Sequence, residues 1–599
     1  MSRRAHRAII TLAALVAIVL GASPALAQTS TAATTATAAT AAVPLSPAGS
    51  TSPPGTARPP RLTSGEVTEI ARTSRRAQAW IADHPITRTP TPVHDAEKNL
   101  WTQSFVDADD TTQAQVLVDD TSGAVVETRI GPQVSWQMAR GYKGAFGRSL
   151  TEPQIWIPLF VLFLVPLIRW RRFFSWHTLD LTALAAFGLS LAWFNRGEIF
   201  TAVPLAYPPM VYLAVRLAWV GLRRPLRRGD AGAPDAGAVT VTSARPRAES
   251  WCPTWLLFAL LLLVLGLRLG LNAFDSNVID VGYAGVIGGD RITHGITPYG
   301  TFPNDCSQCD TYGPVVYLAY APFEAIAPWT GTWNGLDAAH AAAVSFDLFA
   351  IAGLMLLGWR IGGRKLAVLL GFAWTAYPFS AYTLESNSND SLIAAILIWG
   401  LVWAHRPFVR GVAAGLAALS KFTPAILLVL WARSPYPRQP LTPRRLWSYV
   451  GGLAVALVGT GWIILLDGTD GIHAFWSRTL GFQFGRKSPF SIWGQHPELR
   501  PVQLALSALV VIAAVAFIRW PRTLDLRSFA ALSGLLLLGI QLSLTHWFYL
   551  YIPWFLPFAI VALIPIWTRR EEIVAVPGSR PTPVPSVFDA HVRPAGTGG

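Results

Sequence analysis

The residue types best able to do chemistry gather in one polar segment, residues 271–314, with the sequence LNAFDSNVIDVGYAGVIGGDRITHGITPYGTFPNDCSQCDTYGP. This segment comes directly after an apolar run, residues 254–271. Carboxylates are costly in contact with lipid, so a segment rich in them is expected to do chemistry at the mouth of an apolar helix bundle. The groups that could take part are Asp275, Asp280, Asp290, His294, Asp305 and Asp310, together with Tyr283, Tyr299 and Tyr312.

The composition of the chain indicates a polytopic membrane protein. Hydrophobic residues make up 52% of the sequence and charged residues only 14%, less charge than a soluble domain of this length would expose. Apolar runs of about 17–22 residues recur, the length needed to cross a bilayer. The net charge of +14 comes mostly from short basic clusters beside these runs, so it does not require a nucleic-acid partner. We therefore expect an all-α polytopic membrane protein.

The N-terminal segment predicts export. Residues 1–27 contain Arg3, Arg4 and Arg7, then IITLAALVAIVL and the Ala-Leu-Ala pattern of a cleavage site, as in a signal peptide. The alternative is an uncleaved first span, which would also export the next segment. Residues 28–60 are rich in Thr, Ala, Pro and Ser and are predicted to be a disordered linker.

Residues 61–150 predict a small extracytoplasmic α+β domain. Thr63 and Glu66 have the spacing of a helix capping box, and apolar residues continue at helical spacing. The segment VLVDDTSGAVVET is similar to a hairpin of PepSY-type extracytoplasmic domains. Because no catalytic cluster stands out, a binding or regulatory role is expected. The predicted strands are residues 101–107, 115–119 and 124–130.

Arginine clusters assign the sides of the membrane. Extra spans and a cytoplasmic loop are predicted within residues 151–250, and the span 254–271 then runs outward. This order places the polar segment 271–314 outside the cytoplasm. Residues 315–328 are short and broken by Pro322, and are interpreted as interfacial or re-entrant, which leaves open whether they span. The other predicted spans are residues 155–168, 178–194, 201–222, 338–358, 366–384, 391–404, 446–466, 502–518, 529–544 and 549–566.

Two further segments complete the predicted domain order. Residues 411–431 predict a hairpin of two short helices with Lys421 at its outer tip. The catalytic transmembrane domain is predicted to cover residues 251–570. Residues 571–599 are predicted to be a disordered tail, with the C-terminus in the cytoplasm.

The pattern Asp280-x-x-Tyr283, followed by Gly295 and Tyr299, resembles the first outer loop of GT-C-fold membrane glycosyltransferases. The resemblance extends over residues 254–555 and includes AALSKFTP at residues 417–424, which is similar to a hairpin of that family. The nearest relatives by this resemblance are polyprenol-phosphate-mannose-dependent mannosyltransferases. It implies an enzyme that uses a polyprenyl-phosphate sugar and needs no cofactor.

The resemblance also implies roles for residues of the polar segment. An acceptor hydroxyl must lose a proton as it attacks the anomeric carbon, and Asp280 would be the general base of an inverting reaction, with Asp275 as the second candidate. The alternative is that Asp280 only caps the helix that begins at Val281. Tyr283 and Tyr299 are the candidate substrate-binding tyrosines.

Basic residues on the outer side predict an anionic ligand. The outer loop, residues 467–501, carries Arg478, Arg486 and Lys487 interleaved with aromatic residues, against the charge rule followed elsewhere. The candidates are a donor phosphate or, alternatively, lipid headgroups. Lys421 is a further phosphate candidate. Arg268 either binds phosphate as well or reaches the interface with its long side chain.

Other polar residues leave alternatives open. Cys306 and Cys309 lie outside the cytoplasm and predict a local disulfide, and no metal site is expected from their neighbours. His546 would stack on a sugar or belong to an interfacial aromatic belt, and Asp347 would orient a neighbouring span or face a cavity. The turn with Glu385, Asn387, Asn389 and Asp390 would bind sugar hydroxyls or be an ordinary solvated turn.

These features predict a membrane glycosyltransferase that moves a sugar, mannose being the first candidate, from a polyprenyl phosphate to a glycolipid, glycan or protein acceptor outside the cytoplasm. The chain has no phosphate-cradling Gly-rich loop, which favours a lipid donor over a nucleotide sugar. One alternative is a transporter or flippase of lipid-linked sugars, which would not need Asp280. Another is a non-enzymatic envelope sensor led by the exported domain.

Overall fold

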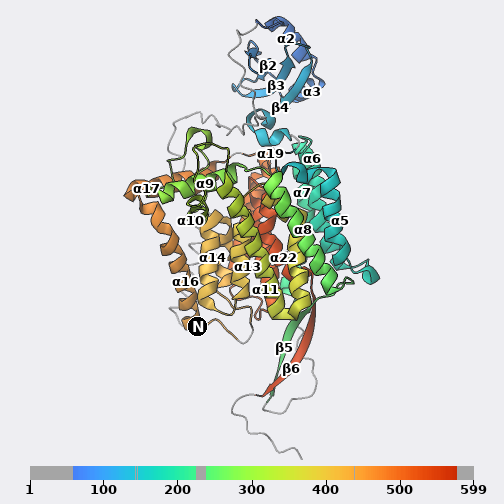
Figure 1. The fold of residues 1–599 in the computed structure, drawn as a ribbon, viewed down its shortest axis with the longest axis vertical. Coiled ribbons are helices and arrows are strands. Elements are labelled where there is room, and N and C mark those ends of the chain that lie inside the picture. Colours follow the sequence, from blue (N-terminus) through green and yellow to red (C-terminus); the bar gives the residue numbers. More distant parts are fainter. Residues whose placement is uncertain are drawn as a thin grey trace, which may run out of the picture.

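The computed structural model describes residues 59–141, 144, 146–223, 238–436, 439–486 and 488–575. Three parts lie one after another along its long axis: a small domain, a bundle of helices, and a two-stranded ribbon at the far end (Figure 1). The predicted signal peptide, nearly all of the linker, Lys487 and most of the predicted tail lie outside the described residues.

The N-terminal domain is an α+β unit, as predicted. Two helices, α2 (Ser64–Arg72) and α3 (Arg75–Asp83), accompany an antiparallel sheet of order β1-β2-β3-β4. The capping box of Thr63 and Glu66 is confirmed, and the helical spacing that follows it covers two helices, the second capped by Ser74. The strands are β1 (Val93–Asp95), which was not predicted, β2 (Leu100–Val106), β3 (Thr112–Asp119) and β4 (Val125–Ile130).

The bundle confirms the predicted fold class. Seven of the described helices are long and apolar enough to cross a membrane, which indicates a multi-pass membrane protein. The 39-residue α11 is two helices joined at Gly363, where φ is +79°, so it provides two of the predicted spans. The helices are α5 (Pro153–Leu167), α6 (Trp176–Phe194), α7 (Ile199–Leu222), α8 (Thr254–Phe274), α11 (Asp337–Thr375), α12 (Pro378–Glu385), α13 (Asp390–Val402), α14 (Pro407–Lys421), α15 (Leu428–Trp431), α16 (Pro443–Gly461), α20 (Arg500–Ala516), α21 (Leu526–Ser543) and α22 (Ile552–Leu563).

Shorter helices cover the end of the bundle that faces the N-terminal domain. They include α9 (Asp280–Thr293), α17 (Gly468–Trp476) and α19 (Ile492–Gln495) (Figure 1). Helix α10 (Pro314–Glu324) has 11 residues, so it is too short to be a span by itself. It packs against α9, α11 and α14. This agrees with the re-entrant interpretation of residues 315–328.

A two-stranded antiparallel ribbon extends from the opposite end of the bundle. It pairs β5 (Ala238–Arg247) with β6 (Ile566–Ala575), where the sequence predicted a loop and the start of a disordered tail. Val239 is in register with Val574 and Thr240 with Ile573, and β-branched residues of this kind favour strands. The two strands are more than three hundred residues apart, and neither segment shows its partner in the sequence.

Arg268 is buried inside the bundle and neither binds at the outer surface nor reaches the interface. Its side chain is 2% exposed and its guanidinium forms an ion pair of 2.9 Å with Asp347. A second hydrogen bond of 2.8 Å goes to the backbone oxygen of Thr375. Both predicted alternatives for Arg268 are therefore wrong, because a buried carboxylate satisfies the charge. Asp347 has the role of orienting a neighbouring span.

Candidate active site

Asp280 is the first residue of α9, and two backbone hydrogen bonds fix the approach to it. Asn277 N–H donates to the oxygen of Glu385 at 3.2 Å, and Ile279 N–H donates to the oxygen of Ser386 at 3.3 Å. The start of α9 therefore lies against the turn between α12 and α13. The carboxylate at position 280 is held at a helix N-terminus, where partial positive charge stabilises its ionised form.

Gly282 allows α9 to approach that turn. A Cβ atom at this position would lie 2.3 Å from the backbone oxygen of Asn387, a distance that real contacts do not reach. The Asn387 side chain donates to Ser276 Oγ at 3.0 Å and to the Asn277 oxygen at 3.1 Å. Close packing and side-chain hydrogen bonds together give the loop before Asp280 one geometry.

The turn from Glu385 to Ser391 is buried, so its interpretation as a solvated turn is wrong. Every residue in it is at most 1% exposed. Burying so many polar groups is costly unless they have partners. The backbone oxygens of the turn and the Asn387 side chain bond to the loop before α9, and Asp390 forms an ion pair. Among the described residues, buried side-chain oxygen atoms of Glu385, Ser386, Asn389 and Ser391 have no hydrogen-bond partner.

Lys421 and Asp390 form that buried ion pair. The distance from Lys421 Nζ to Asp390 Oδ1 is 2.6 Å, and the two side chains are 7% and 1% exposed. Asp390 also accepts hydrogen bonds from Trp554 Nε1–H at 2.9 Å and from Ser388 Oγ–H at 3.0 Å. Lys421 ends α14, and the next residue, Phe422, has a φ of +56°, a strained conformation of the kind often found at functional sites. The predicted hairpin with Lys421 at its tip is confirmed.

Aromatic rings surround the Lys421 ammonium group. Its Nζ lies 5.0 Å from the ring centre of Tyr312, 5.8 Å from that of Tyr551 and 5.6 Å from that of Trp554. Ring faces stabilise a cation without neutralising it. Gly313 places Tyr312 here, because its N–H donates to the oxygen of Ser420 at 2.8 Å and no Cβ would fit beside α14.

Arg486 and His546 form the second cationic part of the site. Arg486 Nη2–H donates to His546 Nε2 at 3.4 Å, so Nε2 is the unprotonated nitrogen. His546 Nδ1–H then donates to Ser488 Oγ at 2.8 Å. Burial lowers the pKa of His546 well below its usual value, and the charges of Arg486 and Lys421 lower it further. His546 is therefore a neutral imidazole that holds the guanidinium of Arg486.

Electrostatics connect Asp280 with both cations. The surrounding protein raises the pKa of Asp280 by withholding water, while the Val281 N–H and the charges of Arg486 and Lys421 act in the opposite direction. The negative charge of Asp390 raises it further. The side chain is nevertheless exposed, so it is a carboxylate that water reaches but that protein surrounds on most sides. These interactions bring together Asp280, Lys421, Arg486 and His546, four predicted site residues from four separate segments.

Other predicted site residues make their contacts elsewhere. Tyr283 is buried, stacks on Trp333 at 4.3 Å and donates from its hydroxyl to Asp305 Oδ2 at 3.0 Å. Asp275 accepts a hydrogen bond from the Ser149 N–H at 3.3 Å, so it ties the segment after the N-terminal domain to this loop. Tyr299 is buried and donates to the backbone oxygen of Tyr312 at 3.2 Å.

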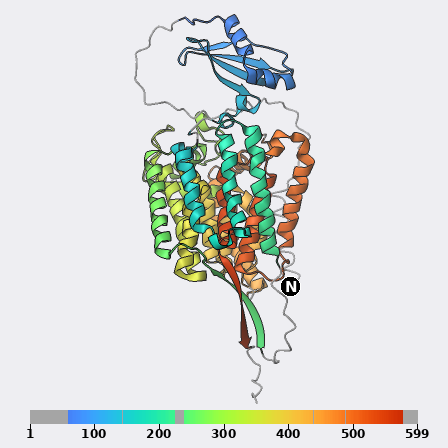
Figure 2. The same cartoon turned by 90° about the vertical axis from the view of Figure 1, so that its right-hand side faces the viewer.

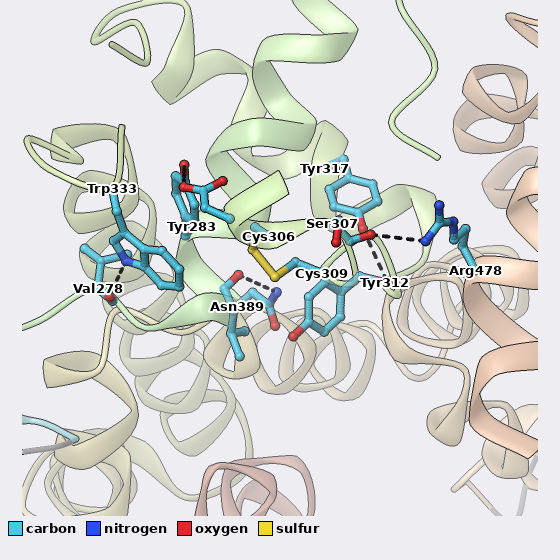
Figure 3. The surroundings of a disulfide bond; sticks show 12 residues. Val278, Tyr283, Cys306, Ser307, Cys309, Tyr312, Tyr317, Trp333, Asn389 and Arg478 are labelled. Atoms are coloured by element: carbon cyan, nitrogen blue, oxygen red, sulfur yellow. Dashed lines mark hydrogen bonds between the residues drawn. A yellow bond between two sulfur atoms is a disulfide. The ribbon is translucent and has the colours of Figure 1, made fainter. Parts of the chain in front are cut away.

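Arg478 and the disulfide form a structural unit beside the site. Cys306 and Cys309 are bonded to each other, and Arg478 reaches their loop to donate to the Ser307 oxygen at 3.1 Å (Figure 3). Arg478 Nε also lies 3.6 Å from Asp310 Oδ2. Its charge is thus matched by a buried carboxylate, and Arg478 joins its own segment to the disulfide loop. Among the described residues, no group of three or more His, Cys, Asp or Glu could hold a metal ion.

Several residues of the site were not singled out from the sequence. They are Trp136, Tyr551, Trp554 and Ser488, and for Asp390 the sequence suggested no ion pair. Tyr551 and Trp554 lie close to His546 in the chain, and an aromatic run there was the only available signal. No sequence signal pointed to Trp136, because its contact with the site comes from the packing of the N-terminal domain.

The family model of glycosyltransferase family 87 matches residues 311–544, less than half of the chain. No curated protein and no solved structure matches it. The family match indicates a membrane glycosyltransferase. The matched segment contains Asp390, Lys421 and Arg486, whereas Asp280 and His546 lie outside it. The resemblances to mannose-specific enzymes and to PepSY-type domains stay predictions.

Proposed function

We propose that the protein is an inverting glycosyltransferase that transfers a sugar, mannose being the first candidate, from a polyprenyl phosphate to an acceptor outside the cytoplasm. The observation that supports this best is the exposed carboxylate of Asp280, which lies within electrostatic range of the cations Lys421 and Arg486. Sugar transfer from a lipid phosphate needs a base for the acceptor and positive charge for the leaving group, and the cluster offers both.

In the proposed reaction, the acceptor hydroxyl oxygen forms a bond to the anomeric carbon as the bond from that carbon to the phosphate oxygen breaks. The electron pair of the broken bond leaves with the polyprenyl phosphate. The hydroxyl proton passes to the Asp280 carboxylate. A single displacement of this kind inverts the configuration at the anomeric carbon. Burial raises the pKa of Asp280, which makes it a stronger base than an ordinary aspartate.

The leaving phosphate would be held by Arg486 and Lys421. Within the described part of the chain, Arg486 has no carboxylate at ion-pair distance, and its buried Nε atom has no hydrogen-bond partner. The Lys421 ammonium group has three N–H donors, of which Asp390 takes one. Charged donors in a site shielded from bulk water form strong hydrogen bonds to phosphate oxygens.

The arrangement of the chain supports an extracytoplasmic site. The N-terminal domain and the short helices α9, α17 and α19 lie at one end of the bundle, and the β5–β6 ribbon lies at the other (Figure 1). If the N-terminal domain is exported, the site lies outside the cytoplasm and residue 575 inside. This is the sidedness that the arginine clusters predict.

Transfer from radiolabelled polyprenyl-phosphate-mannose in membranes tests the proposal. Asp280→Asn should lower turnover by about 10²-fold to 10⁴-fold, the contribution of a general base, while the protein still inserts. Asp275→Asn tests the second candidate base, and its turnover should stay unchanged because the new amide oxygen can still accept from Ser149. Unchanged turnover in Asp280→Asn would move the base to another residue. Transport of the lipid-linked sugar without transfer would favour a flippase.

A further inference from the structure

The segment after the sheet of the N-terminal domain reaches the candidate active site. Trp136 lies between the short helix α4 (Pro132–Ser135) and a 3₁₀ turn, and it is half-buried. Its ring centre is 5.6 Å from that of Phe490 and 6.2 Å from that of His546. The guanidinium carbon of Arg486 lies 5.9 Å from the Trp136 ring centre. An exported domain thus contributes a side chain to the wall of a membrane-embedded site.

Trp136 is one of few groups that hold Arg486. The guanidinium also lies 5.7 Å from the ring centre of Phe482 and donates to His546 Nε2. None of these neighbours is charged, so they fix the position of the guanidinium and leave its charge for an anion. If one ring is removed, the long side chain gains conformations that are wrong for the phosphate.

The turn between α6 and α7 anchors the N-terminal domain. Gly141 meets Gly197 so closely that a Cβ on Gly141 would lie 2.1 Å from the Gly197 nitrogen. Gln133 Nε2–H donates to the Gly197 oxygen at 2.8 Å and to the Ala139 oxygen at 3.0 Å. This contact fixes both ends of the short segment that contains Trp136.

Contacts of the domain's helix α3 extend this interface. Arg76 forms an ion pair of 3.6 Å with Glu198, and the ring of Trp80 stacks on that of Phe200 at 5.3 Å. Figure 2 shows the domain above the end of the bundle, joined to it through the segment after β4. Helices α6 and α7 lie outside the segment that matches the glycosyltransferase family. They serve as a platform for the domain.

We propose that Trp136 is a positioning residue for Arg486, and that docking of the exported domain on the turn between α6 and α7 completes the site for the donor phosphate. The inference rests on the proposed function, in which Arg486 binds that phosphate. It gives the N-terminal domain a defined role, because the affinity for the lipid phosphate then depends on whether the domain is docked.

Steady-state transfer by the full-length protein tests the role of the ring. Trp136→Ala should raise the apparent KM for the polyprenyl-phosphate sugar about fivefold to thirtyfold, the range expected for a lost cation–π contact, with a smaller change in kcat. Trp136→Phe should keep most of the affinity, because a phenyl ring retains a face for the guanidinium. If Trp136→Phe is as impaired as Trp136→Ala, the ring face is not what matters and the inference fails.

A glycine pair tests the role of docking. Gly141→Ala introduces a clash with Gly197 and should raise KM as Trp136→Ala does. Gly123→Ala is the matched control, because Gly123 also has a positive φ of +71° but only an ordinary contact of 3.7 Å beside it. If docking acts through Trp136, the double variant Gly141→Ala and Trp136→Ala should be no worse than either single variant. Additive effects would contradict this connection.

Equilibrium binding of undecaprenyl phosphate to the purified protein separates the inference from the proposed function. Weaker binding by Trp136→Ala and Gly141→Ala, with wild-type binding by Gly123→Ala, supports the inference even if the wild type transfers no sugar. In that case only the proposed function fails. Binding equal to that of the wild type in both variants would overturn the inference.

Discussion

Removing the charge of Lys421 offers a test that separates its structural role from its functional one. Lys421→Met leaves Asp390 buried with two neutral donors, Trp554 Nε1–H and Ser388 Oγ–H, but without its counter-charge. The double variant Lys421→Met and Asp390→Asn removes both charges, and the new amide oxygen can still accept from Trp554. The single variant should be unstable, whereas the double variant should be stable but inactive.

The size of the effect can be worked out from the geometry of the pair. Two unit charges 2.6 Å apart attract by about 6 kcal/mol at an effective dielectric constant of about 20. Desolvation of the two groups offsets part of this attraction, and breaking one side of such a pair typically costs about 3–5 kcal/mol. Because Asp390 keeps two donors, we expect Lys421→Met to lower the free energy of unfolding by the smaller of these values, about 3 kcal/mol. The double variant, which replaces both charges, should lower it by no more than about 1 kcal/mol.

Unfolding in mixed micelles titrated with sodium dodecyl sulfate would measure the stability, and radiolabelled sugar transfer would measure the activity. A charged hydrogen bond to the donor phosphate contributes about 1.5–3 kcal/mol, so kcat/KM of the double variant should fall about tenfold to 150-fold. If the double variant regained wild-type transfer, Lys421 would only stabilise the fold. If it were as unstable as Lys421→Met, the energy assigned to the pair would be wrong.

Three further predictions concern Asp280. Its raised pKa means that the carboxylate takes up a proton at a higher pH than an ordinary aspartate, so kcat/KM should be lost as the pH falls through that raised value. His546→Gln should leave this acidic limb in place, because His546 is neutral, and a limb that vanished in this variant would belong to His546. The folded state also binds the Asp280 proton more tightly than the unfolded chain, so this contribution to stability is full at low pH and is lost as the pH rises through the raised pKa. Asp280→Asn should therefore not lower the unfolding midpoint at neutral pH. Gly282→Ala places a Cβ that clashes with Asn387, so it should displace Asp280 and reduce turnover at least tenfold. Gly270→Ala is the control, because a Cβ there meets nothing within 4 Å, and its turnover should stay unchanged. Turnover of Gly282→Ala equal to that of the wild type would show that the turn does not position α9.

The sequence alone determined most elements of the bundle and singled out several residues of the candidate site. Runs of apolar residues identify helices that cross a membrane, and a charged residue between such runs stands out because lipid excludes it. For this reason Lys421 and Arg486 could be selected before their distances were known, whereas Asp280 was selected through the resemblance of the pattern Asp280-x-x-Tyr283 to a family motif. The breaks at Gly363 and after Lys421 were also visible, since arginine clusters and a proline mark where the chain turns.

Only the tertiary structure decided which of the selected charges are available to a ligand. Arg268 and Arg478 have the same residue type as Arg486, yet buried carboxylates, Asp347 and Asp310, match their charges. Trp136 enters the site only because a separate domain docks beside it. Such pairings join segments tens to hundreds of residues apart. Local periodicity reports which face of a helix is buried, but it carries no information about the partner that a side chain meets there, and that partner decides whether a buried charge is neutralised or free to bind.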